Sequence, residues 1–242
     1  MERIKRVLVD LFDCIYRTCG NFDILIFLLP VFILLGAIYL CARAMWHKRR
    51  FGNDFSTIRR TSRLNEFIRL LLFCWGIFQC FGLLLPTEFW YHFWKCMVNG
   101  LNPFEDFWAT PDVPNLIPYP VQCAVNGHLD YLVKSTHHII HLLLNVSLFI
   151  PFGLLFPFIY KKATLAKVTL IGLSISLVVE IAQIFINGRD SDIDDLLCNV
   201  LGTVIGYLMY AFMKKILPKF TYKCKLSAAD VFSELSGLDS RP

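Results

Sequence analysis

The chain has 242 residues, of which 56% are hydrophobic and only 18% are charged, and its mean hydropathy is +0.53. Soluble domains carry about 25% charged residues. This composition therefore excludes a soluble fold, because too little polar sequence would remain to cover the apolar residues. The formal net charge of +5 does not indicate a nucleic-acid partner, because no polar segment is long enough to form a soluble domain that displays a basic patch.

The first predicted element is the basic N-terminal stretch MERIKRVLVDLFDCIYR. Its apolar residues recur at helical spacing, with the charges on the other side, which predicts an amphipathic helix lying at the membrane surface. A partly buried cap on a helix bundle fits the same pattern. No small-residue cleavage site closely follows the next apolar run, so a cleaved signal peptide is not expected.

Five apolar segments follow this stretch. A helix that crosses a bilayer needs roughly 20 mostly apolar residues, and the fourth segment reaches that length if Glu180 is tolerated. The predicted fold class is therefore all-α, a polytopic transmembrane helix bundle with about five spans and an N-terminal amphipathic helix. The charge-free runs cover residues 24–42, 70–87, 139–160, 168–179 and 196–213.

The basic residues predict the orientation of a five-span chain. Segments 42–65, 159–167 and 214–242 share one side and hold sixteen Arg and Lys residues, whereas the other side holds seven, four of them in the N-terminal segment. Because basic loops stay in the cytoplasm, we expect a multi-pass protein of the cell membrane with a cytoplasmic C-terminus. The basic N-terminus fits poorly outside, and Pro30 leaves open a first span that dips in and returns.

Polar residues form one stripe on each of the last three predicted spans. Such residues within a membrane helix usually face the bundle interior, so the three stripes are expected to face one another. They are His137, His141 and Asn145 on the third span, Ser176, Glu180, Gln183 and Asn187 on the fourth, and Asp192, Asp195, Asn199, Gly202, Thr203 and Gly206 on the fifth.

The helical rise of about 1.5 Å per residue places Asn145, Glu180 and Asn199 in one layer of the membrane. The rim above this layer would hold His137, Arg189 and the aspartates of GRDSDIDD (188–195). The sequence thus predicts a polar pocket that opens outward. Its binding residues would be His137, His141, Asn145, Glu180, Gln183, Arg189, Asp192, Asp195 and Asn199. The preceding NLIPYP (115–120) is expected to be extended, because each Pro biases the residue before it away from helix.

Each part of this pattern also has a purely structural interpretation. Asp192 is a good helix cap, and Arg189 would neutralise the neighbouring acids as a structural ion pair. The amides would act as interhelical hydrogen bonds, and Gly202 and Gly206 as a close-packing face. His137 and His141 lie four residues apart, but without a HExxH arrangement no metal site is predicted.

The nine cysteines show no metal-binding spacing. Cys96 and Cys123 are the only two in the large outer loop, which leaves a disulfide between them open. The sequence predicts neither a cofactor nor an oligomeric state.

Four segments resemble the signature blocks of VanZ-like membrane proteins, and their order and spacing also match. The blocks are NLIPY (115–119), NVSLFIPFG (145–153), SLVVEIAQ (176–183) and RDSDIDDLLCNVLGTVIGY (189–207). The resemblance covers residues 66–213. This predicts an N-terminal part over 1–65 with the amphipathic helix, first span and basic loop, a VanZ-like domain over 66–213, and a basic tail over 214–242.

The resemblance implies a bacterial cell-membrane protein. The founding members of the family are similar to an accessory factor that raises resistance to the lipoglycopeptide antibiotic teicoplanin, and no cofactor is implied. The positions that match the family blocks are Asn145, Pro151, Gly153, Glu180, Gln183, Arg189, Asp192, Asp195, Asn199, Gly202 and Gly206.

Two functional hypotheses follow. In the first, the outward pocket binds a lipid-linked glycan, a cell-wall precursor or an acyl-tailed antibiotic; the aromatic segment 90–108 favours it, because Trp and Tyr prefer the interface and stack on sugars. In the second, Glu180, Asp195 and Arg189 are catalytic groups of an intramembrane acid–base or metal-assisted enzyme acting on a lipid-linked envelope substrate. No nucleophile motif supports the second, and a transporter is disfavoured because no inverted repeat is present. Membrane lipids are partners in either case.

Overall fold

The computed structural model contains helices joined by loops, with no β-strand in the part of the chain that it describes, namely residues 23–84, 89–105, 107–108, 114–126, 136–189 and 191–236, with Lys5, Arg6 and Val9. The predicted N-terminal amphipathic helix therefore lies almost wholly outside the described residues. The elements are α2 (Asp23–Phe51), η2 (Gly52–Asp54), α3 (Phe55–Thr61), α4 (Arg63–Phe78), the π-helical η3 (Gln79–Leu83), α5 (Phe89–Asn99), α6 (Tyr119–Val125), α8 (Thr136–Ile159), α9 (Leu165–Gln183), α10 (Ile193–Ile216), α11 (Pro218–Lys225) and α12 (Ala228–Ser236).

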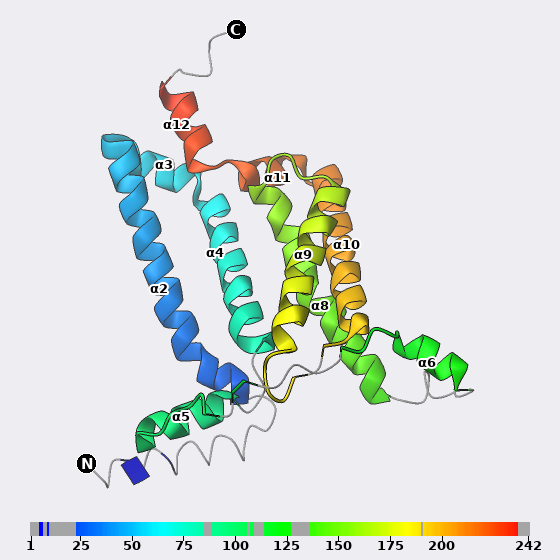
Figure 1. The fold of residues 1–242 in the computed structure, drawn as a ribbon. Coiled ribbons are helices and arrows are strands. Elements are labelled where there is room, and N and C mark those ends of the chain that lie inside the picture. Colours follow the sequence, from blue (N-terminus) through cyan, green and yellow to red (C-terminus); the bar gives the residue numbers. More distant parts are fainter. Residues whose placement is uncertain are drawn as a thin grey trace.

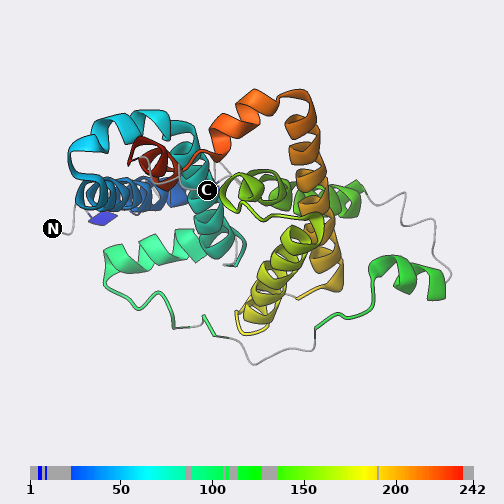
Figure 2. The ribbon, with the colours of Figure 1, turned by 90° about the horizontal axis from the view of Figure 1, so that it is seen from above.

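Five of the described helices are long and apolar enough to cross a membrane, which confirms the predicted all-α polytopic fold. Figure 1 shows them running between two ends of a bundle, which we call the C-terminal end, with α3, α11 and α12, and the loop end, with α5 and α6. Seen from above, α8, α9 and α10 group together, while α4 separates them from α2 (Figure 2). The spans are Leu29–Phe51, Arg63–Phe81, Ile139–Ile159, Leu165–Gln183 and Ile193–Ile216.

The first span is a single continuous helix. α2 contains Pro30 and continues for 21 residues beyond it, to Phe51. A first span that dips in and returns is therefore not what the chain forms. The charge-free run predicted for this span ended at residue 42, whereas the helix extends into the basic segment and ends with Lys48, Arg49 and Arg50 in its last turn.

The second span begins at Arg63, earlier than the predicted run at residue 70. Its carboxylate is paired with another helix: Arg43 of α2 donates from Nε and Nη2 to Glu66 of α4, at 3.0 and 2.6 Å. Arg69 donates to Asn65 at 2.9 Å within α4. A search for charge-free runs excludes this segment, although its hydrogen-bonded Glu66 and Arg69 belong to the helix.

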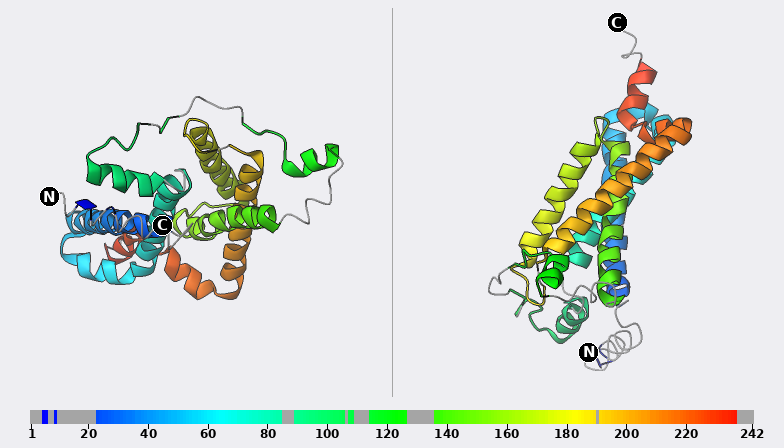
Figure 3. Two further views of the ribbon diagram at one scale, coloured as in Figure 1. Left: turned by 90° about the horizontal axis from the view of Figure 1, so that it is seen from below. Right: turned by 90° about the vertical axis from the view of Figure 1, so that its right-hand side faces the viewer.

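Glycines let α8 and α10 pack at short range. A Cβ atom at Gly202 would collide with the carbonyl oxygen of Val146, and one at Gly206 with that of Ile150. Gly172 on α9 is similarly restricted, since its Cβ would lie 2.5 Å from Oγ1 of Thr203 on α10. The close-packing interpretation of Gly202 and Gly206 is thus confirmed. Figure 3 shows α10 inclined across the other two helices.

The cysteines of the outer loop do not form a disulfide. Cys96 and Cys123 are both free. They lie on α5 and α6, which occupy opposite sides of the loop end (Figure 1). The disulfide that the sequence left open is therefore not formed in this structure.

Candidate functional site

Glu180, near the end of α9, binds the turn between α9 and α10 through hydrogen bonds to its carboxylate. Its Oε2 accepts hydrogen bonds from the backbone N–H of Asp192 at 3.1 Å and from Oγ of Ser191 at 3.2 Å. The residue is only 6% exposed. Because this carboxylate is buried and satisfied by the turn, its arrangement is that of an anchor for the polypeptide beside it.

Asp195, on the first turn of α10, is joined to α8 and is open to solvent. Asn145 Nδ2 donates to Asp195 Oδ1. His141, one turn earlier on α8, places Nδ1 at 3.7 Å from the same oxygen. The Asp195 side chain is 22% exposed and that of His141 is 53% exposed. These three residues form what we call the Asp195 cluster, which presents a carboxylate and an imidazole to an approaching ligand.

Asn199 joins α10 to α9 one turn further into the bundle. Its Nδ2 donates to Oγ of Ser176 at 2.9 Å, and both residues are buried. Thr203 donates from Oγ1 to the Asn199 carbonyl at 3.0 Å within α10. This arrangement matches the interpretation of these amides as interhelical hydrogen bonds.

Arg189 lies in the turn between α9, which carries Glu180, and α10, which carries Asp195. Burial lowers the pKa of its guanidinium, whereas the carboxylates of Asp195 and Glu180 act in the opposite direction. An arginine keeps its charge even so, because its ordinary pKa lies far above neutral pH. The turn itself depends on Gly188, whose φ of 76° is in the left-handed region that favours glycine.

Asp192 caps α10, which confirms the structural interpretation of this residue. Its side chain accepts a hydrogen bond from the backbone N–H of Asp194 at 3.0 Å. The neighbouring Asp194 was predicted on the pocket rim but not among the binding residues; it is buried and accepts from the backbone N–H of Tyr119 at 2.7 Å.

Residues 115–118 lie along the turn outside any helix, with Asn115 paired to the turn through its backbone. The extended conformation predicted for NLIPYP (115–120) is wrong at its last two residues, because α6 begins at Tyr119. The Asn115 N–H donates to the Ser191 carbonyl, and the Ile193 N–H donates to the Asn115 carbonyl, both at 3.0 Å. On the other side of the turn, the Asn187 N–H donates to the Phe107 carbonyl at 3.0 Å. Two segments that are distant in the sequence therefore contact the turn, and only the prolines of NLIPYP indicated one of them in advance.

The predicted site residues are thus joined in pairs, and the described hydrogen bonds do not link Asn145, Glu180 and Asn199 directly to one another. Asn145 bonds to Asp195 on α10, Glu180 to the turn before α10, and Asn199 of α10 to Ser176 on α9. Gln183 is buried at the end of α9. His137 lies in the first turn of α8, but its side chain is outside the described residues. Within the described part of the chain, no three His, Cys, Asp or Glu side chains are grouped to hold a metal.

A family model described as VanZ/LLP1 matches residues 83–214, more than half of the chain. The chain belongs to the VanZ/LLP1 family. The VanZ/LLP1 match includes α8, α9, α10 and the turn between the last two, and with them every residue of the Asp195 cluster. It begins in η3 rather than at residue 66, so α2 and α4 precede it. No curated protein and no solved structure matches the chain significantly.

Proposed function

We propose that this VanZ/LLP1 membrane protein binds an amphiphilic ligand with a sugar-bearing headgroup, a lipid-linked glycan of the cell wall or an acyl-tailed glycopeptide such as teicoplanin. The observation that carries the proposal is the Asp195 cluster, in which Asn145 orients a solvent-accessible carboxylate beside the exposed His141. A carboxylate and an imidazole together accept from and donate to hydroxyl and amide groups, which are the groups that such headgroups present.

Apolar side chains around the cluster suit the rest of such a ligand. On α8, Leu143 and Leu144 are exposed close to Asn145, and on α10 Leu197 is exposed close to Asp195. An acyl chain would lie against this surface within the bilayer. Trp108, which is 71% exposed and pairs through its backbone with Ile186 beside the turn, offers a flat ring for a sugar.

The proposal requires the loop end to face the exterior. The C-terminal end carries the basic residues that the positive-inside rule assigns to the cytoplasm, including Lys48 to Arg50 in the last turn of α2 and Lys214 and Lys215 in that of α10. With five spans the loop end then faces the exterior, where the protein would meet cell-wall precursors and glycopeptides. A contribution to glycopeptide resistance or to envelope assembly is the corresponding role in the cell.

A second candidate function is an intramembrane enzyme that acts on a lipid-linked envelope substrate. The observation that favours it is the carboxylate–imidazole pair of Asp195 and His141, with atoms 3.7 Å apart and both side chains accessible, as general acid–base catalysis requires. Arg189 would stabilise negative charge on the substrate. Glu180 is the weaker catalytic candidate, because Oε2 already accepts two hydrogen bonds from the turn.

The test compares Asp195→Asn with the matched control Glu105→Gln. Glu105 is an exposed carboxylate two residues before Phe107. Full-length protein in lipid nanodiscs is titrated with teicoplanin and with the same glycopeptide core lacking the acyl chain. We expect roughly tenfold weaker teicoplanin binding for Asp195→Asn, no change for Glu105→Gln, and weak binding of the core alone.

Equal teicoplanin affinity in both variants and the wild type would contradict the proposed site. The enzyme is tested with a radiolabelled lipid-linked disaccharide incubated with the same nanodiscs. Conversion by the wild type that is lost in Asp195→Asn and retained in Glu105→Gln would replace the binding proposal with the enzymatic one.

A further inference from the structure

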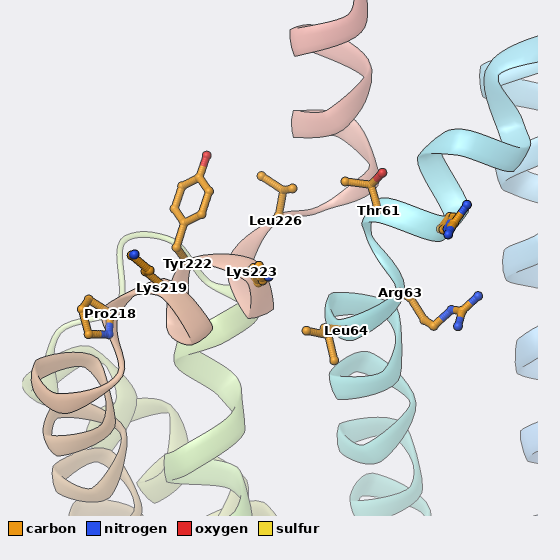
Figure 4. A pocket seen from close by; sticks show the side chains of 9 residues that line it. Thr61, Arg63, Leu64, Pro218, Lys219, Tyr222, Lys223 and Leu226 are labelled. Atoms are coloured by element: carbon orange, nitrogen blue, oxygen red, sulfur yellow. The ribbon is translucent and has the colours of Figure 1, made fainter.

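A cavity of about 900 Å³ lies at the C-terminal end, whereas Asp195 lies at the opposite end of α10. Its walls come from the junction of α3 and α4 and from α11 with the residue that follows it (Figure 4). Four of the nine lining side chains are cationic, and none is a carboxylate. The cations are Arg60, Arg63, Lys219 and Lys223, and Leu64 and Leu226 contribute apolar surface.

The cations of this cavity are not neutralised within the described part of the protein. None of the four makes an ion pair with a described residue. The nearby carboxylates are committed elsewhere: Glu66 pairs with Arg43, and Asp230 pairs with Lys161. An anion that entered the cavity would therefore meet donors without a competing acid.

The cavity lies at the depth where the membrane spans end. The span on α4 begins at Arg63, and the span on α10 ends at Ile216, two residues before α11 begins. Below it, Leu64, Phe67 and Leu71 are exposed along one face of α4, and this stripe extends roughly 10 Å into the membrane. A charged opening is thus continuous with an apolar surface, since Leu64 belongs to both.

The two walls are held together, so the cavity exists without a ligand. Asn65, which is fully buried, donates from Nδ2 to the Cys224 carbonyl of α11 at 2.8 Å and to the Phe158 carbonyl of α8 at 3.3 Å. In Figure 4, Leu64 projects from α4 toward α11, while Arg63 extends toward α2. Arg60 and Arg63 also line a second cavity of about 730 Å³ between α2 and α4, so the positive surface continues around α4.

We infer that this cavity binds the phosphate headgroup of an anionic phospholipid, with an acyl chain lying along the α4 stripe. Phosphate oxygens accept charge-assisted hydrogen bonds from Lys and Arg, and basic pockets at this depth between membrane helices suit anionic headgroups. A zwitterionic lipid is disfavoured, because its own cation would meet the unpaired cations of the walls. A soluble phosphate compound would use the same donors but not the apolar stripe.

The test uses full-length protein in nanodiscs of phosphatidylcholine alone or with phosphatidylglycerol, and measures the unfolding temperature and the lipids retained in native mass spectra. The cavity variant is Lys219→Gln with Lys223→Gln. The matched control is Lys214→Gln with Lys215→Gln, which removes the same charge from exposed positions at the same end. We expect phosphatidylglycerol to raise the unfolding temperature of the wild type and of the control. The cavity variant should bind phosphatidylglycerol roughly tenfold more weakly than the control does.

Three results would overturn the inference. Equal losses in the cavity variant and the control would show that phosphatidylglycerol binds through general surface charge. Equal stabilisation by glycerol 1-phosphate in phosphatidylcholine nanodiscs would assign the cavity to a soluble phosphate compound. If the cavity variant unfolds early in phosphatidylcholine, it is replaced by Leu64→Trp, which narrows the cavity where it meets the apolar stripe without changing charge. Normal phosphatidylglycerol binding by that variant would equally contradict the site.

Discussion

Glu180 and Asp195 are both carboxylates near the loop end, but their surroundings give them different tasks. Glu180 is buried and accepts from Asp192 and Ser191, whereas Asp195 is partly exposed and accepts from Asn145 on another helix. Loss of the first should disturb the turn, and loss of the second should change the surface that a ligand meets.

The Glu180→Ala variant should unfold more easily than the wild type, by about 1–3 kcal/mol, because the Asp192 N–H and the Ser191 hydroxyl lose a buried acceptor. Hydrogen exchange in mild detergent should show faster exchange at Asp192. Asp195→Asn serves as the control, since an amide oxygen can still accept from Asn145. A Glu180→Ala protein as stable as the wild type, with a protected Asp192 amide, would contradict the anchoring role.

The Gly202→Ala variant should destabilise the packing of α8 against α10. The added methyl group would collide with the Val146 carbonyl, and overpacking of this kind costs about 1–3 kcal/mol. The matched control is Gly36→Ala on α2, where no atom lies within 4 Å of the added Cβ and alanine favours the helix. Thermal unfolding in nanodiscs should show a lower midpoint for Gly202→Ala alone. Similar midpoints for both variants would count against close α8–α10 contact.

The polar residues on α9 and α10 were predictable at this scale because helical spacing fixes which side chains share a face. The partner of Asp194 was not predictable. It is the backbone N–H of Tyr119, 75 residues away, and a backbone donor carries no signal in the side-chain sequence. Conversely, Asp192 offered two interpretations, and only the hydrogen bond to the Asp194 N–H selects the cap.

Among the helices, α10 connects the other two members of the family domain. Its glycines allow α8 to approach, Asn199 bonds to α9, and Asp195 bonds to α8. The sequence predicted three polar faces turned toward one another but not the pairing, because the order in which helices contact each other is a property of tertiary packing. The boundary of α4 was missed for a related reason, since the partner of Glu66 is Arg43 on another helix.

The attachment of α12 should depend on pH. Burial alone would raise the pKa of Asp230, but the hydrogen bonds from Lys161 and Ser227 outweigh it, and the pKa is lower than usual. The stabilisation is therefore complete above the ordinary Asp pKa of about 3.9 and is lost as the pH falls through the lower folded value. Because the pair is partly exposed, we expect about 1 kcal/mol or less.

Hydrogen exchange of peptides from 226–236 measures this dependence, as protection that declines only in strongly acidic buffer. In Asp230→Asn the protection should be lower at neutral pH and should no longer change over that range. Protection in the wild type that does not change between neutral and strongly acidic pH would contradict the role of Asp230.

The whole molecule has two ends of different chemistry. The loop end presents the Asp195 cluster and exposed aromatic residues, and the C-terminal end presents unpaired lysines and arginines. Five spans place these ends on opposite sides of a membrane. We propose that the Asp195 cluster faces the exterior and contacts an amphiphilic ligand there.

Thiol labelling of Ile140→Cys, beside His141 on α8, tests this placement in intact cells, in a background with the native cysteines replaced; Ile140 is exposed, and the substitution leaves the Asp195 cluster whole. We expect a membrane-impermeant maleimide to label residue 140 from outside and teicoplanin to slow the labelling, whereas Lys214→Cys is labelled only after permeabilisation. Labelling of residue 140 only after permeabilisation, or at a rate that teicoplanin leaves unchanged, would show that the Asp195 cluster is not an exterior ligand site.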